Sequence, residues 1–398
     1  MPDGHKVAIT GIGLVLPCGV GKAAAGAVFR GESSIARLTG FDGLDGATGA
    51  ALSGFVPPAG TERADRSVQF AAAAADEAWA EAGLASRRMD PGRLAVVFAM
   101  SKGGVHAMAD WAAGDAAGAW LRAAPDAAAR TVAWRLGARA GALAPVTACA
   151  SGGHALVWGA RLILRGAADA VVVGAADASL HPLVLASYQQ LGVLAPGGDR
   201  PEASVRPFSR TRRGFAVGEG AGAMVIESAA SAARRGAKVL ALLSGWASGA
   251  HAESLIDVEP RGEAMAHLMS LALARAAVAP GAVQYVNAHG SATPRSDLAE
   301  ARAIRKVFGA AADGLSVSST KGGHGHLLGA ATAVELVLAV LAIGRGEVPP
   351  TVNLTDPDPA IDLDCTPLRP RRRTIRHALK IASGFGGQTL AVCLSAPG

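Results

Sequence analysis

The sequence predicts a mixed α/β protein built from two successive series of strands and helices. Apolar runs typical of strands, such as residues 93–100 and 169–177, alternate with longer stretches that have helical spacing, such as residues 64–84. Near-continuous apolar strands are typical of a sheet that is covered on both faces. The same alternation occurs twice along the chain, which predicts an internal duplication with halves at residues 1–236 and 237–398.

Each half supplies its own strands and helices in order. In the first half we expect strands at residues 6–17, 93–100, 144–149, 169–177 and 222–228, and helices at 64–84, 129–141 and 152–166. In the second half we expect strands at 238–248, 283–290, 315–320, 377–387 and 389–395, and helices at 261–276, 294–309 and 326–346. The first strand carries "GIG" with Leu16 where a third glycine would stand, so a dinucleotide site is not supported.

The composition narrows the class of partner. Half of the 398 residues are apolar and 18% are charged, as in compact globular proteins. The net charge is only +6, and no nucleic-acid motif is present, so we expect no nucleic-acid partner. A diffuse positive surface would instead suit an acidic protein or a phosphorylated ligand.

The chain is expected to act in the cytoplasm, without a membrane span. Its longest apolar run, residues 327–343, is slightly short for a span and contains Glu335, so we expect a buried core helix there. The four cysteines are far apart and lack CxxC spacing, and the N-terminus has no signal-peptide pattern. These features predict free thiols in a reducing compartment.

The stretch "VTACASGG", residues 146–153, is a first candidate for chemistry. It predicts the end of a buried strand followed by a helix, with Cys149 at the joint. A helix N-terminus stabilises a thiolate and so favours a nucleophile. Taken alone, however, a single cysteine among alanines favours a small buried core residue.

Two further stretches place histidines at strand-to-helix turns. "VNAHGSATPRSD" carries His289, and "STKGGHGHLLGAATAVE" carries His324 and His326, each in a glycine-rich rather than an apolar setting. These imidazoles and Cys149 could be metal ligands, but the spacing is not that of a structural zinc site, and no metal is predicted. A cysteine with two histidines suits acyl transfer through a thioester, with imidazole N–H groups stabilising an oxyanion or enolate.

Two other features could support such a site. Lys321 precedes a helix and Glu335 lies deep in its apolar face, which favours a buried pair that fixes the His326 loop, the alternative being two solvated side chains. "GFGGQ", residues 384–388, is either a simple turn or a loop whose Phe385 N–H completes an oxyanion hole. The most basic run, residues 368–380, is expected to be a solvated surface.

Taken together, these residues resemble the β-ketoacyl-[acyl carrier protein] synthases, the condensing enzymes of the thiolase fold. The resemblance spans the chain and rests on six motifs in order: "VAITGIGLVLPCG", "TACASG", "RPFSRTRRGFAVGEGAG", "AHGSATPRSD", "KGGHGHLLGAATAVE" and "GFGG". It is closest to the elongating branch with a Cys-His-His site. It implies a thiolase-like fold, in which two duplicated βαβαβαββ halves form five layers, α-β-α-β-α.

The resemblance implies a decarboxylative Claisen condensation of an acyl thioester with malonyl-acyl carrier protein. Cys149 would take the acyl chain, and His289 and His326 would promote malonyl decarboxylation and stabilise the enolate. The N–H groups of Cys149 and Phe385 would form the oxyanion hole, and the Phe385 side chain would gate the acyl pocket. No metal or organic cofactor is implied, because the substrates arrive on the phosphopantetheine of acyl carrier protein.

The resemblance also implies supporting residues and partners. Lys321 and Glu335 would be the buried supporting pair. Acyl carrier protein would dock electrostatically, with Arg63 and Arg66 as candidate contacts. The enzyme would be a homodimer or a heterodimer with a ketosynthase-like chain-length factor.

Several positions depart from the usual family pattern: the Ser291–Asp297 loop, Ser209, Arg213, His324, Thr332 and Gln388. They favour a bacterial type II polyketide pathway, polyene pathways included, over housekeeping fatty-acid elongation, which is the alternative. His324 would add a third imidazole near the site. A non-catalytic chain-length-factor-like subunit is disfavoured because the catalytic cysteine and histidines are retained, and a thiolase using coenzyme A because "GFGGQ" lacks a cysteine.

Overall fold

One sheet of eleven strands runs through the part of the chain that the structure describes. The structure is a computed structural model, and it describes residues 7–41, 44, 46–84, 89–114 and 118–398. The strands follow the order β12 (Ser316–Ser318), β11 (Tyr285–Asn287), β15 (His377–Ser383), β16 (Gln388–Ser395), β10 (Ala241–Ala250), β1 (Val7–Leu16), β9 (Gly220–Ser228), β7 (Ala170–Asp177), β5 (Leu94–Ala99) and β6 (Gly141–Leu143), and β2 (Gly19–Val20) pairs with β1.

The pattern of antiparallel and parallel strand pairings is the same on both sides of the contact between β1 and β10. From β1, the next two pairings (β9, then β7) are antiparallel and the following two (β5, then β6) are parallel. From β10, the same pattern runs through β16, β15, β11 and β12. The half-sheets meet where Val7–Ile9 of β1 pairs with Ala241–Leu243 of β10. This order supports the predicted division at residues 236 and 237, which stays a prediction.

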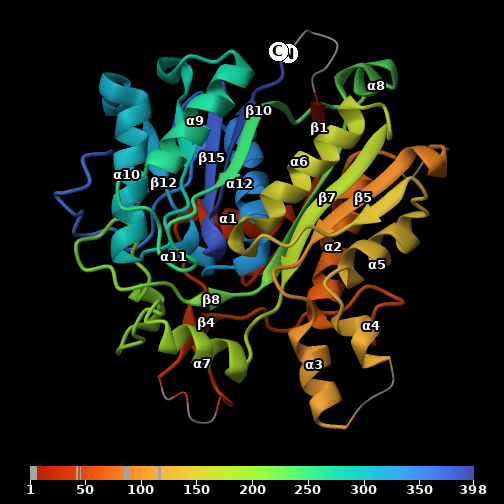
Figure 1. Ribbon diagram of the computed structural model, residues 1–398, viewed down its shortest axis with the longest axis horizontal. Coiled ribbons are helices and arrows are strands. Elements are labelled where there is room, and N and C mark those ends of the chain that lie inside the picture. The colour runs from red at the N-terminus through yellow and green to blue at the C-terminus, as the bar shows by residue number, and fades with distance from the viewer. Residues whose placement is uncertain (1–6, 42–43, 45, 85–88, 115–117) are drawn as a thin grey trace.

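Helices complete five layers (Figure 1). Each outer layer packs on one half-sheet through its own apolar cluster, and the central layer packs between the two half-sheets through a third cluster. The outer helices of the first half-sheet are α2 (Arg66–Glu81) and α5 (Ala127–Leu136), the central helices are α6 (Ser151–Leu164) and α12 (Ala331–Arg345), and the outer helices of the second are α9 (Glu263–Ala276) and α10 (Pro294–Phe308). The predicted α-β-α-β-α arrangement is confirmed.

Smaller elements surround these layers. They comprise α1 (Ala25–Arg30), α3 (Val105–Ala112), α4 (Ala119–Ala123), α7 (Pro182–Gln190), α8 (Ala229–Arg234), α11 (Lys321–His324), a three-stranded sheet of β3 (Ala36–Arg37), β4 (Thr48–Ala50) and β8 (Val217–Gly218), and the pair β13 (Glu347–Val348) and β14 (Arg371–Arg372). The sequence did not predict the small sheet, because its strands are too short to have a period.

The central helix α12 is apolar around most of its circumference, Glu335 excepted, because most of it is enclosed by the protein. The segment Leu328–Arg345 is long and apolar enough to cross a membrane by length and composition alone, but 83% of it is buried inside the protein. A helix that is apolar all round is expected at the core of a large domain. The prediction of a buried core helix is confirmed.

The strand expected at residues 144–149 is wrong. The edge strand β6 ends at Leu143, residues 144–147 form a loop, and Ala148–Ala150 form a short 3-10 turn, η4. Val146 is 49% exposed rather than buried. The β propensity of Val146 and Thr147 is overridden because Pro145 has no N–H to donate and Ala148 takes a left-handed conformation with φ of 48°.

Small residues bring α2 unusually close to β1. A Cβ atom added to Gly13 would lie 2.0 Å from the Ala74 carbonyl oxygen, and one on Gly11 would lie 2.0 Å from that of Ala78. No side chain can relieve such a contact, since both groups are backbone. The alanine-rich face of α2 and the glycines of β1 therefore form one close-packed contact.

We expect Gly13→Ala to lower the free energy of unfolding by about 1–3 kcal/mol, because the added methyl group overpacks this contact. Gly344→Ala is the matched control, since nothing lies within 4 Å of its Cβ position in α12. That change should be neutral or stabilising, because alanine is the better helix former. Chemical denaturation of both variants measures the difference, and equal stability would contradict the contact.

Candidate active site

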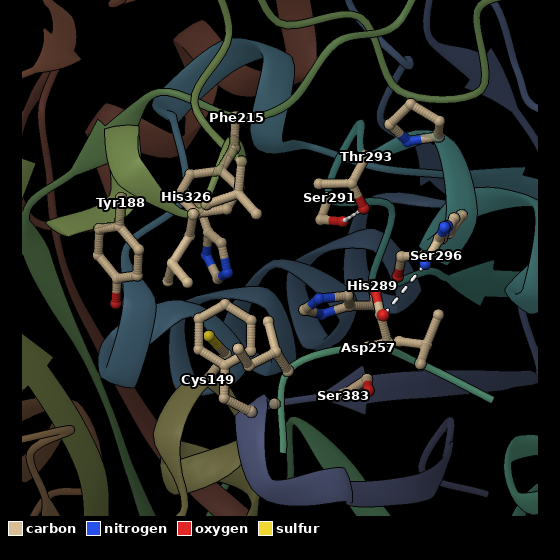
Figure 2. A pocket seen from close by; sticks show the side chains of 18 of the residues that line it. Cys149, Tyr188, Phe215, Asp257, His289, Ser291, Thr293, Ser296, His326 and Ser383 are labelled. Atoms are coloured by element: carbon tan, nitrogen blue, oxygen red, sulfur yellow. Dashed lines mark hydrogen bonds and ion pairs between the residues drawn. The ribbon is translucent and has the colours of Figure 1, made fainter. Parts of the chain in front are cut away.

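One cavity of about 300 Å³ brings Cys149, His289 and His326 together. Cys149 lies in η4 before helix α6, His289 in the loop after β11, and His326 between α11 and the 3-10 turn η8 (Leu328–Ala330). Figure 2 shows the Cys149 sulfur and both imidazole rings around the same space. The two ring centres are 5.6 Å apart, with their planes nearly perpendicular. The three residues that the sequence singled out therefore meet, although their roles stay predictions.

The Cys149 turn is held by side-chain hydrogen bonds. The Ser151 hydroxyl accepts from the Thr147 N–H at 2.9 Å and donates to the Ala148 carbonyl at 2.6 Å. The Thr332 hydroxyl of α12 donates to the Cys149 carbonyl at 2.7 Å. These bonds stabilise the left-handed Ala148 and fix Cys149 at the cavity wall. Thr332, a departure from the family pattern, thus contacts the nucleophile's own backbone.

The "GFGG" loop lies against the Cys149 backbone. A Cβ on Gly384 would be 3.0 Å from the Cys149 nitrogen, so the loop and this N–H are in close contact. Phe385 lines the cavity, and its ring centre is 6.3 Å from that of Tyr188. The loop therefore places the Phe385 backbone and ring beside Cys149, as an oxyanion hole and gate would require.

A buried ionic cluster lies beneath the His289 loop. Glu335 of α12 forms an ion pair with Lys321, and its second oxygen is 2.7 Å from Lys380 Nζ. Lys321 Nζ also donates to the His289 carbonyl, and Lys380 Nζ donates to the Ala288 carbonyl at 3.0 Å. Both lysine side chains are fully buried. The expected Lys321–Glu335 pair is thus one side of a three-residue cluster.

Two residues of this region were not found from the sequence. Lys380 is the last residue of the basic run that the sequence predicted to be a solvated surface. That prediction is wrong for Lys380, because its side chain is fully buried in the apolar strand β15. Glu300 gave only a weak sequence signal, as an acidic residue of the polar helix α10, on its buried face. Its carboxylate accepts hydrogen bonds from the N–H groups of His289 at 2.6 Å and Gly290 at 2.8 Å. Its partners are backbone groups, which a sequence pattern does not reveal.

Both imidazoles are neutral at physiological pH. Burial, with the nearby charge of Lys321, lowers the pKa of His289 and of His326 well below the ordinary value. The Leu328 N–H donates to Nδ1 of His326 at 3.3 Å, so the ring proton of this neutral imidazole is on Nε2. His326 can therefore act as a hydrogen-bond donor within the cavity.

Burial raises the pKa of the Cys149 thiol to about 11, although the positive charges of Lys321 and Lys102 oppose this effect. The resting cysteine is therefore a thiol. Its proton must be lost when the sulfur attacks, and a neutral imidazole beside it can accept a proton.

His324 and Gln388, two departures from the usual family pattern, are not among the described residues that line the cavity. His324 is fully buried, with Nδ1 2.8 Å from the Gly325 carbonyl and Nε2 2.8 Å from the Thr320 hydroxyl. Gln388 begins β16, opposite Ala250. The third imidazole is therefore part of the packing behind His326 and does not reach the cavity space.

The two candidate docking arginines differ in their surroundings. Arg66 forms two hydrogen bonds to Glu219, at 2.9 and 2.7 Å, and one to the Leu52 carbonyl at 2.7 Å. Arg63 is exposed on the surface. Because the Arg66 guanidinium is largely engaged inside the protein, Arg63 is the better docking candidate of the two.

Among the residues that the structure describes, no group of three or more His, Cys, Asp or Glu side chains could hold a metal ion. All four cysteines are free.

A thiol and two neutral imidazoles around one cavity suit acyl transfer through a thioester, the chemistry of a condensing enzyme. The Beta-ketoacyl synthase N-terminal domain model matches residues 5–232, and the C-terminal domain model matches residues 240–355. The chain therefore belongs to the β-ketoacyl synthase family.

The chain is similar to proteins of polyketide and fatty-acid pathways along its whole length. It is 37% identical to a Streptomyces rimosus protein named as oxytetracycline polyketide β-ketoacyl synthase 1, over 100% of this chain and 98% of the relative. It is 33% identical to 3-oxoacyl-[acyl-carrier-protein] synthase 2 of Coxiella burnetii, over 98% of each chain.

Two solved structures share the fold. One is a type II PKS acyl-carrier protein in complex with its ketosynthase bound to the hexaketide, with a TM-score of 0.92, 32% identity and coverage of 99% of this chain and 100% of that one. The other is the ishigamide ketosynthase/chain length factor, with a TM-score of 0.90, 29% identity and the same coverage.

We expect Glu335→Gln to destabilise the protein by about 3–5 kcal/mol, because it leaves two buried lysines without a counter-charge. Glu263→Gln is the control, since its ion pair with Lys306 is exposed and the change should cost less than ~0.5 kcal/mol. Denaturation curves at pH 7 compare the two variants. If both variants lost a similarly small free energy of unfolding, the buried lysines would not depend on the charge of Glu335.

Proposed function

We propose that this chain is a ketosynthase of a bacterial type II polyketide pathway. It joins an acyl thioester to malonyl-acyl carrier protein by a decarboxylative Claisen condensation. The observation that carries the proposal is the meeting of Cys149, His289 and His326 in one cavity. The polyketide assignment is supported by the names of its relatives, among them the oxytetracycline protein.

The first half-reaction loads the acyl chain on Cys149. The sulfur attacks the thioester carbonyl, and its proton passes through a neutral imidazole to the departing phosphopantetheine thiolate. The developing oxyanion accepts hydrogen bonds from the N–H groups of Cys149 and Phe385, which lie together because Gly384 approaches the Cys149 nitrogen so closely. The product is an acyl thioester on Cys149.

The second half-reaction forms the carbon–carbon bond. His289 and His326 donate hydrogen bonds to the malonyl thioester oxygen, carbon dioxide leaves, and the electron pair forms an enolate. The enolate carbon attacks the acyl carbonyl on Cys149, and the tetrahedral intermediate collapses with release of the Cys149 thiolate, which regains a proton. The chain on the carrier protein is now two carbons longer and carries a β-keto group.

Every electron pair in this sequence comes from the substrates or from Cys149. We propose that the reaction uses no metal or organic cofactor, the substrates being carried on the phosphopantetheine of acyl carrier protein. We place the protein in the cytoplasm, where its four free cysteines would remain reduced. Arg63 is proposed as an electrostatic contact to the acidic carrier protein.

The partner subunit is proposed to cover an apolar surface around the edge strand β6. At this edge, Leu143 of β6 and Val146 of the loop that follows have exposed apolar side chains. Exposed apolar residues beside an unpaired strand edge are typical of an interface. The partner is a second copy or a chain-length factor, as in the ishigamide ketosynthase/chain length factor.

A fatty-acid elongation synthase is the second candidate, favoured by the identity to the Coxiella 3-oxoacyl-[acyl-carrier-protein] synthase 2. It would use the same residues and differ in the acyl chain. A non-catalytic chain-length-factor-like subunit is disfavoured, because Cys149, His289 and His326 are all present and all line the cavity.

We expect Cys149→Ala to abolish condensation, because no acyl thioester can form, while dimerisation and malonyl decarboxylation persist. Mass spectrometry of the carrier-bound products, with gel filtration as the control, measures these outcomes. Acyl elongation by the purified variant would refute the role of Cys149. Mass spectrometry of chains trapped on wild-type Cys149 would separate polyketide from fatty-acid substrates.

His326→Ala should mainly slow malonyl decarboxylation, by about 100-fold, since one oxyanion donor is lost. Acyl loading of Cys149 should change much less. Release of carbon dioxide from malonyl-acyl carrier protein measures the first step, and intact-protein mass spectrometry measures the second. An unchanged rate of decarboxylation would remove His326 from the proposed mechanism.

The pH dependence follows from the lowered pKa of both imidazoles. Because their neutral forms persist below the ordinary value of 6.5, decarboxylation should stay constant from pH 8 down to about 6. The Cys149→Ala variant isolates this step from thiol titration. A loss of rate centred near pH 6.5 would show instead that an imidazole titrates normally.

A further inference from the structure

A second buried carboxylate lies on the other side of the site, at the end of strand β7. The Asp177 side chain is 3% exposed and belongs to no part of the Glu335 cluster. It accepts hydrogen bonds from the hydroxyls of Ser101 and Ser179 and from the Gly329 N–H at 3.1 Å, and Lys102 Nζ is 3.5 Å away. The mechanism above assigns no role to this group.

Asp177 accepts a hydrogen bond from the N–H of Gly329, and the N–H of the preceding residue, Leu328, donates to His326. The Gly329 N–H and the Leu328 N–H are consecutive groups of the turn η8, and the second of them donates to Nδ1 of His326. A Cβ on Gly329 would lie 2.5 Å from the Ser101 nitrogen, so this turn is pressed against the end of β5. The position of the His326 ring therefore depends on how Asp177 holds η8.

Lys102 brings a positive charge to the same place. Its Nζ donates to the Ser179 hydroxyl at 2.7 Å, and its side chain is 32% exposed, so the charge is only partly screened by water. The Lys102 charge lowers the pKa of Cys149, whereas the Asp177 charge raises the pKa of Cys149. The two members of this pair therefore act on the nucleophile in opposite directions.

We propose that Asp177 and Lys102 are positioning residues for the condensation: Asp177 holds the η8 turn and thereby the His326 ring, and Lys102 balances the charge beside Cys149. This inference rests on the proposed function, since it assigns separate effects to its two half-reactions. The contact between Asp177 and the η8 turn connects the two half-sheets, because Asp177 is on β7 of the first and His326 follows β12 of the second.

A pair that supports only the fold would behave differently. Loss of either charge would then loosen the whole site, and thiol reactivity and decarboxylation would fall together. The positioning role instead predicts that the two properties separate. Asp177→Asn keeps the shape of the side chain and removes its charge, and Lys102→Met keeps most of the length and removes the ammonium group.

The experiment measures two properties of the full-length protein. One is the steady-state decarboxylation of malonyl-acyl carrier protein, with kcat and KM determined separately. The other is the pH profile of iodoacetamide alkylation, followed by mass spectrometry on the peptide that contains Cys149. Asp169→Asn and Arg93→Met are the matched controls, since that ion pair lies at the opposite, exposed end of β7, with a distance of 2.7 Å.

Asp177→Asn should lower the kcat of decarboxylation about tenfold, as expected for one weakened charge-assisted hydrogen bond, with little change in KM. The same variant should alkylate faster at pH 8, because the charge that disfavours the thiolate is gone. Lys102→Met should shift the alkylation profile to higher pH and leave decarboxylation within about twofold. Both control variants should match the wild type.

Parallel changes in both properties, or none, would overturn the inference. If Asp177→Asn did not fold, as judged by circular dichroism and melting, the alkylation profile of Lys102→Met would still decide: no shift would overturn it. A wild type that fails to decarboxylate malonyl-acyl carrier protein would refute the proposed function instead, so the two failures are distinguishable.

Discussion

The buried carboxylate of Glu335 is the constraint on which the site depends. It lies between Lys321 and Lys380, and each of these lysines donates to a backbone carbonyl of the loop that carries His289. Burial and the nearby positive charges of Lys321 and Lys380 both act on the His289 ring. Both disfavour imidazolium, so His289 stays neutral, and the positive charges favour the enolate and oxyanion that the reaction would form.

The second constraint is that Cys149 and the two imidazoles belong to different half-sheets. Packing of α6 against α12 aligns them, and two hydrogen bonds fix the alignment: Thr332 to the Cys149 carbonyl, and the Gly329 N–H to Asp177. Both come from one short segment at the start of α12.

Buried strands and a largely apolar helix have clear patterns, so the sequence predicted the alternation of strands and helices, while the five layers were implied by the family resemblance. Motifs at predicted strand ends singled out Cys149, His289 and His326. The sequence assigned Lys380 to a solvated basic run, because a three-residue basic cluster upstream dominates that stretch, although β15 itself is apolar. It missed Asp177 because this is a single charge at the end of an apolar strand, and Ser101 and Gly329, which bind it, are distant along the chain. The strand expected at residues 144–149 failed for a related reason. Local propensity favours a strand there, but Ala148 is left-handed. The turn around it is held by local hydrogen bonds of the Ser151 hydroxyl and by the tertiary hydrogen bond from Thr332 to the Cys149 carbonyl.

In the loop at residues 384–387, which faces Cys149, glycines are favoured at three positions for two different reasons, and only Phe385 has a side chain. Gly384 has an ordinary extended backbone, but a Cβ there would meet the Cys149 nitrogen at 3.0 Å, so the close approach favours glycine. Gly386 and Gly387 have φ of 77° and 74°, so conformation requires glycine. Phe385 alone presents a side chain to the cavity, where it faces Tyr188. We therefore expect selection of the acyl chain to act through this aromatic pair, while the glycines preserve the backbone on which the oxyanion would be held.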